Sequence, residues 1–195
     1  MPHDSLSFIF LDAVLANNFV LALFLGLCPF LGVSGRLETA LPMGLATTFV
    51  MLVSSICAWL INAILVTFQI EFLRLIAYIA VIASAVQLVE MALKKFSPGL
   101  FRALGIYLPL ITTNCAILGL ALFQTFRHYD FLQSLVFSLG AGGGFTLAIL
   151  LMAGLREKLA LAEVPSIAQG AAISLILGGL LSLTFMGFAG LGGQT

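Results

Sequence analysis

The sequence predicts an all-α integral membrane protein, with six transmembrane helices arranged as two inverted three-helix repeats and with breaks in helices 1 and 4. Hydrophobic residues make up 62% of the 195-residue chain and charged residues only 8%, whereas soluble domains contain about 25% charged residues. The formal net charge is zero, and the sequence contains no polybasic stretch of the kind that binds nucleic acid. The number of helices is inferred from the apolar runs, and the two repeats are inferred from a repeated cysteine pattern.

Charged residues and turn formers divide the chain into six apolar runs, each long enough to cross a hydrocarbon core of about 30 Å. We place these runs at about 6–33, 40–66, 71–93, 101–123, 131–154 and 168–190. The whole chain, 1–195, is then a single transmembrane domain, with repeat one at about 6–95 and repeat two at about 100–190. Because each repeat has an odd number of spans, the two repeats have opposite orientations.

Two cysteines occupy near-equivalent apolar segments. Cys28 and Cys115 lie 87 positions apart (115 − 28), and the same shift brings Leu31-Gly32 onto Leu118-Gly119. This pattern indicates a duplicated half with a thiol at each copy of one site. Cys57 has no counterpart at that spacing, so we interpret it as a packing residue.

Breaks in the first and fourth runs would bring the two thiols together. Equivalent positions of inverted repeats converge near the bilayer midplane, but both cysteines come late in their runs, so continuous helices would place them near opposite faces. Pro29 disfavours α geometry at Cys28, and Pro109 removes a helical hydrogen bond shortly before Thr112. We therefore expect two half-helix breaks at these positions.

Metal ligation is the functional interpretation of Cys28 and Cys115. Soft thiolates suit iron–sulfur clusters, whose [2Fe–2S] and [4Fe–4S] forms usually need four cysteines. This chain offers two, so a cluster would need two more thiolates from a partner chain, most simply a homologous subunit with the same repeat. Two alternatives stay open, namely that the cysteines are small buried hydrophobic residues or that they form a disulfide.

Polar residues near the expected breaks are further candidates, because intramembrane polar groups are often functional. Asn17 and Asn18 precede Cys28, and Thr112, Thr113 and Asn114 adjoin Cys115. They could hydrogen-bond cluster sulfurs, cap broken helices or line an ion route. We expect Thr113 and Asn114 to surround the centre and tune it without ligating it.

Small and acidic residues have simpler interpretations. Gly140 and the run 142–144 are small residues that let membrane helices approach closely. Asp12 lies one or two turns inside the first run, and Glu90 lies near Lys94 at the end of the third. Neither carboxylate is a convincing buried ion-binding group.

Lysine and arginine positions predict the orientation. Six of them fall in the segments after runs one, three and five: Arg36, Lys94, Lys95, Arg102, Arg156 and Lys158. The opposite face has only Arg74 and Arg127. We therefore expect the first set in the cytoplasm and both termini outside, which is the periplasm in a Gram-negative host.

Several stretches closely resemble the RnfA family of membrane proteins from the Rnf electron-transport complex, and the related Nqr sodium pump has a similar pair of membrane proteins. The resemblance covers nearly the whole chain and is carried by Asn17-Asn18-Phe19-Val20-Leu21, Phe24-Leu25-Gly26-Leu27-Cys28-Pro29-Phe30, Leu37-Glu38-Thr39-Ala40, Gly44-Leu45-Ala46-Thr47-Thr48-Phe49-Val50, Leu108-Pro109-Leu110-Ile111-Thr112-Thr113-Asn114-Cys115-Ala116, Arg156-Glu157-Lys158 and Phe185-Met186-Gly187-Phe188.

This resemblance implies a bacterial inner-membrane protein paired with a homologous protein of opposite orientation, RnfE. The two would share an intramembrane iron–sulfur centre, which we expect to be a [2Fe–2S] cluster with two cysteines from each chain. By motif, Cys28 and Cys115 are the ligands of this chain. The family's complex passes electrons between ferredoxin and NAD through flavins and iron–sulfur centres, coupled to Na⁺ or H⁺ movement. The ferredoxin, NAD and flavin sites would belong to the other components, RnfB, RnfC, RnfD and RnfG.

Our leading hypothesis is a redox relay, in which the chain is a non-autonomous subunit of a translocase. The alternatives are a metal-free ion-conducting subunit and a scaffold that only positions other subunits. Two symmetric thiols at helix breaks favour the relay, whereas an ion carrier should have a better buried carboxylate than Asp12 or Glu90.

Overall fold

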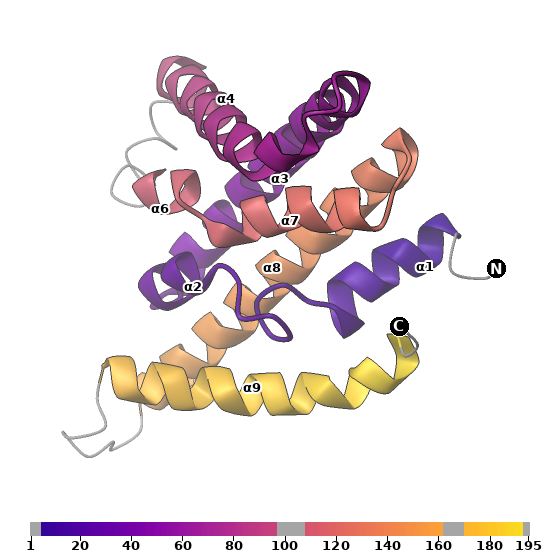
Figure 1. Ribbon diagram of the computed structural model, residues 1–195. Helices are drawn as coiled ribbons and strands as arrows, with labels where there is room; N and C mark the ends of the chain where they lie inside the picture. Colours follow the sequence, from indigo (N-terminus) through magenta and orange to yellow (C-terminus); the bar gives the residue numbers. More distant parts are fainter. Residues whose placement is uncertain (1–4, 97–107, 162–169, 193–195) are drawn as a thin grey trace.

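All regular secondary structure in the described parts of the chain is helical. The computed structural model describes residues 5–96, 108–161 and 170–192 (Figure 1). The elements are α1 (Leu6–Leu11), the π-helix η1 (Asp12–Ala16), α2 (Leu27–Val33), α3 (Leu37–Thr67), the short 3₁₀ helix η2 (Glu71–Leu73), α4 (Arg74–Phe96), α6 (Leu108–Thr112), α7 (Cys115–Phe126), α8 (Phe131–Ala160) and α9 (Ala171–Gly192).

Four helices, α3, α4, α8 and α9, are long and apolar enough to cross a membrane. The first apolar run is divided into α1, η1 and α2, and the fourth into α6 and α7, so both runs are interrupted as predicted. In Figure 1 the first interrupted run passes from right to left and the fourth from left to right. Six complete spans stay a prediction, and the start of the fourth run, with Arg102, lies outside the described residues.

The positions of the breaks differ from the prediction. We expected non-helical backbone at Cys28, but Cys28 and Pro29 lie in the first turn of α2, and the irregular segment is 17–26. Proline is tolerated there because the N–H groups of a first helical turn have no intrahelical acceptor. Pro109 likewise lies in the first turn of α6, so the second break comes later, at Thr113 and Asn114.

Helix ends also extend beyond the apolar runs. We placed the second run from 40, but α3 begins at Leu37, after Arg36 in extended conformation. We ended the fifth run at 154, but α8 continues to Ala160. Apolar composition marks the part of a helix inside the bilayer, whereas backbone hydrogen bonding continues into the polar interface.

The centre of the molecule is the crossing of α3 and α8, the most extensive helix contact (Figure 1). A Cβ atom on Gly44 would lie 2.6 Å from Cγ2 of Thr146, and one on Gly142 would lie 2.5 Å from Cγ2 of Thr48. The two threonine hydroxyls are 3.3 Å apart. Each helix thus places a glycine under the threonine of the other, which brings the two backbones close together.

A second face of α8 contacts the first interrupted run. A Cβ atom on Gly140 would lie 2.9 Å from the carbonyl oxygen of Phe10, and one on Gly144 would lie 3.0 Å from that of Ala13. The predicted packing role is therefore confirmed for Gly140, Gly142 and Gly144. Gly143 differs, since its added Cβ would meet nothing closer than 3.9 Å.

Two neighbouring glycines therefore give a matched test of this packing. We expect Gly142→Ala to lower the free energy of unfolding by about 1–3 kcal/mol, because its Cβ would overlap the Thr48 side chain. Gly143→Ala should be neutral or slightly stabilising, because alanine is favoured over glycine in helices. Denaturant or thermal unfolding of the purified protein in detergent measures both, and equal effects of the two substitutions would contradict the packing argument.

Candidate functional site

Asn18 organises the first break. Its side chain is fully buried and its amide nitrogen donates to the carbonyl oxygens of Val14, at 3.0 Å, and Gly144, at 2.8 Å. Its side-chain oxygen accepts from the backbone N–H groups of Val20 and Leu21. Of the roles considered for Asn18, the structure supports satisfying the backbone of a broken helix, which is needed at membrane depth.

Asp12 takes part in an ion pair that the sequence analysis missed. Its side chain is 6% exposed and accepts from Nη1 of Arg127 at 3.1 Å. Asn17 donates to both carboxylate oxygens, at 2.8 and 3.0 Å. The same Arg127 nitrogen contacts the hydroxyl of Tyr129 at 2.9 Å. Asp12 and Arg127 are 115 positions apart in the sequence, so no local spacing pattern predicts that they pair. The one available signal is general: a carboxylate inside an apolar segment needs a partner.

Arg156 holds the other end of the first interrupted run. Its Nη1 donates to the carbonyl oxygen of Leu31 at 3.0 Å and contacts the hydroxyl of Ser34 at 3.1 Å. These acceptors lie at the C-terminal end of α2, where helix carbonyls lack intrahelical donors and a cation is favoured. Glu157 accepts from the backbone N–H of Leu37, at the start of α3, at 2.9 Å.

The structure brings the two predicted site cysteines to neighbouring helix starts. Cys115 is the first residue of α7, and its Sγ atom accepts a hydrogen bond from the backbone N–H of Gly26 at 2.9 Å. Cys28 follows Gly26 by two residues, in the first turn of α2. Both thiols are exposed and neither is in a disulfide. They are therefore neither buried hydrophobic residues nor a cystine.

Gly26 fits closely between the two repeats. Its φ is +78°, a left-handed conformation that side chains other than glycine rarely adopt. A Cβ atom here would lie 2.8 Å from Cε2 of Phe145 and 3.1 Å from the side-chain oxygen of Asn114. Both the backbone conformation and the space therefore require glycine.

The Asn114 side chain uses only one of its two polar atoms in hydrogen bonding. Its side-chain oxygen accepts from the backbone N–H of Ala116 at 3.0 Å, which caps α7. Its amide nitrogen is buried without a hydrogen-bond partner in the described structure, and the residue is only 5% exposed. Thr113 is exposed. A buried donor without an acceptor is costly, so the Asn114 amide is an unsatisfied group directly beside Cys115 in the sequence.

This donor set fits half of an iron–sulfur site. Within the described residues, no group of three or more histidine, cysteine or acidic side chains could hold a metal ion. Cys28 and Cys115 supply two soft ligands, and Gly26 supplies a backbone N–H to one of them. Four-thiolate coordination then requires two thiolates from another chain. Cys57 lies elsewhere, half-buried within α3.

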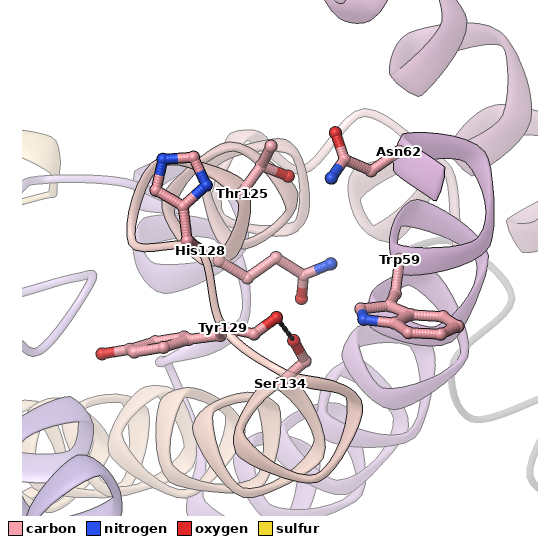
Figure 2. Close-up of a pocket in the computed structure, with 7 residues that line it drawn as sticks. Trp59, Asn62, Thr125, His128, Tyr129 and Ser134 are labelled. Carbon is pink, nitrogen blue, oxygen red and sulfur yellow. Dashed lines mark hydrogen bonds between the residues drawn. The ribbon is translucent and has the colours of Figure 1, made fainter. Parts of the chain in front are cut away.

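A separate polar cavity of about 40 Å³ lies between α3 and the junction of α7 and α8. Figure 2 shows Trp59, Asn62, Thr125, His128 and Ser134 around it, and Gln124 also lines it. Gln124 is fixed by two hydrogen bonds to Ser55, at 2.7 and 3.1 Å. The lining mixes donors and acceptors without a carboxylate, and its volume suits two or three water molecules.

The comparisons with known proteins agree with this architecture. A family model described as "Rnf-Nqr subunit, membrane protein" matches residues 6–192. The chain belongs to the Rnf-Nqr family. The resemblance found in the sequence is thereby confirmed over nearly the whole chain.

Three relatives are each named as the A component of an ion-translocating oxidoreductase complex. That of Syntrophotalea carbinolica is 57% identical over 188 residues, which cover 96% of this chain and 97% of the relative. That of Photorhabdus laumondii is 54% identical, and that of Citrobacter koseri is 56% identical, each covering 94% of this chain and 95% of the relative. The similarity therefore extends over nearly the full length of this chain and of each relative.

Proposed function

We propose that this chain is the RnfA component of an Rnf-type ion-translocating oxidoreductase complex in a bacterial inner membrane. In this role it relays electrons across the membrane through a [2Fe–2S] centre that it shares with the homologous RnfE. The complex transfers electrons between ferredoxin and NAD and couples this transfer to Na⁺ or H⁺ movement. The names and full-length similarity of the relatives support membership in such a complex.

The observation that carries the relay is the placement of two exposed thiols at adjacent helix starts of an apolar, all-helical chain. When bound, the iron–sulfur group supplies one-electron chemistry. Cys28 and Cys115 would hold it from this side, and the N-terminal end of the 12-residue helix α7 would favour the overall negative charge of the bound group. The Asn114 side chain, which adjoins Cys115 in the sequence and has an unpaired amide nitrogen, would be a further donor near the centre.

Inverted repeats would explain the internal symmetry of the molecule. The glycine–threonine pairs of the central crossing repeat at one spacing, since Gly44 and Gly142 are 98 positions apart (142 − 44), as are Thr48 and Thr146 (146 − 48). The two interrupted runs point in opposite directions (Figure 1). A homologous partner with the same breaks, placed across the exposed thiols, would complete the four-cysteine site.

We also propose that both termini are periplasmic. Arg156 contacts Ser34 and the end of α2, so the basic segments after runs one and five lie at the same end of the molecule. Arg127 and Asp130 lie at the other end of the long helix α8. This arrangement supports the orientation inferred from lysine and arginine counts.

Cysteine substitutions test the relay directly. We expect Cys28→Ser and Cys115→Ser each to abolish the electron paramagnetic resonance signal of the shared centre, together with its iron and acid-labile sulfide, because each removes one of four thiolate ligands. Cys57→Ser is the matched control and should leave the centre intact. A normal signal in either ligand variant, within an assembled complex, would show that this cysteine is not a ligand of the centre.

The polar neighbours should tune the centre rather than hold it. Asn114→Leu and Thr113→Val should lower the reduction potential and slow turnover while iron content stays near wild type, because donors near sulfur stabilise the reduced state. Asn114→Ser keeps a cap for α7 but removes the amide donor, so it should lower the potential at little cost in stability. Redox titration and unfolding measurements separate these effects. If iron content falls in proportion to activity, both residues instead maintain the structure of the helix break at which they lie.

Labelling of single introduced cysteines tests the orientation. The labelling of the wild-type chain, which has its own free cysteines, is measured in parallel and subtracted. We expect Thr195→Cys, beyond the described residues, to react with a membrane-impermeant reagent in intact cells. Lys94→Cys should react only after permeabilisation. The opposite result at both sites would reverse the topology.

A further inference from the structure

We propose that the backbone N–H of Gly26 sets the reduction potential of the centre through its hydrogen bond to the Sγ atom of Cys115. The inference rests on the proposed function, because it concerns a thiolate that would hold the shared iron–sulfur group. The bond is 2.9 Å long and joins atoms 89 positions apart in the sequence. It therefore links the irregular segment of the first interrupted run to the ligand of the second.

The hydrogen bonding of the two thiols is unequal. Within the described structure, Sγ of Cys115 accepts the Gly26 N–H, whereas Sγ of Cys28 accepts no hydrogen bond. Held by Cys28 and Cys115, the centre would accept one electron from a flavin or iron–sulfur group elsewhere in the complex and would gain one unit of negative charge. A donor to sulfur stabilises this added negative charge. The Gly26 N–H therefore raises the reduction potential of the centre, and it does so through the Cys115 ligand alone.

The donor is fixed in place by its surroundings. A backbone N–H has no side-chain rotamer to lose, and the segment reaches Cys115 only with Gly26 in its left-handed conformation, φ +78°. The Phe145 ring and the Asn114 side chain leave no room for a Cβ atom, which would lie 2.8 Å and 3.1 Å from them.

The test is a redox titration of the intact purified complex by electron paramagnetic resonance. In Gly26→Ala the added Cβ displaces the segment, so the ratio of reduced to oxidised centre at the wild-type midpoint potential should fall about tenfold, or about 59 mV for a one-electron couple. The iron content should stay near wild type. Gly179→Ala is the control, because its Cβ would meet nothing within 4 Å, and it should leave the ratio unchanged.

A spectroscopic signature separates this role from general packing. With glycine labelled by ¹⁵N, pulsed electron paramagnetic resonance of the reduced complex should show a weak coupling to an amide nitrogen. Gly26→Ala, made with unlabelled alanine, should lose that coupling, and Gly179→Ala should keep it. Retention of every ¹⁵N coupling in Gly26→Ala would overturn the inference.

If Gly26→Ala does not assemble, Phe145→Leu provides the second variant. It keeps the glycine but removes the ring that packs against it, so the ratio should fall in the same direction by a smaller factor. An unchanged or raised potential, with the centre intact, in every variant that assembles overturns the role of Gly26 and leaves the proposed function standing. Absence of iron and acid-labile sulfide from the wild-type complex overturns the proposed function itself.

Discussion

The need to satisfy irregular backbone inside a membrane shapes this structure more than any other constraint. Lipid offers no hydrogen bonds, so a broken helix persists only where the protein supplies donors and acceptors. Asn18 does this at the first break with four hydrogen bonds to backbone groups. Asn114 does it at the second by capping α7. The close approach of α8 at Gly144 allows Asn18 to reach across, so the break depends on the helix packing.

The sequence predicted an all-helical membrane protein with long apolar helices because composition and run length depend on the solvent, and hydrocarbon excludes nearly everything except apolar helices. The two interruptions were also predictable from Pro29, Pro109 and the late position of both cysteines in their runs. Their positions were not, because a proline breaks a preceding turn but also begins a new one, and the sequence around Cys28 and Pro29 permits either. The helix caps and the carbonyls of Gly144 and Val14 decide the outcome, and these are tertiary contacts.

The candidate site was predictable as a pair of residue types but not as an arrangement. The spacing of 87 relates the cysteines, whereas the glycine and threonine pairs of the central crossing are related by 98. The difference of 11 (98 − 87) lies between the half-helices and the crossing, where α7 has 12 residues and α2 only seven. A single sequence offset of 87 therefore aligns the two cysteines but does not align the glycine–threonine pairs of the α3–α8 crossing. Gly26 gave no signal either, because its partners lie in the other repeat.

The two arginines of the second repeat have a mechanical consequence for the first. Arg127 fixes the Asp12 half of the interrupted run at one end, and Arg156 fixes α2 at the other. Between them lies the irregular segment, where Phe24 and Gly26 both have positive φ. Because both of its ends are anchored, the irregular segment cannot slide along its axis, which fixes the position where Gly26 meets Cys115. The second repeat thus sets, through its two arginines, how the first repeat is aligned against the cysteine of the second.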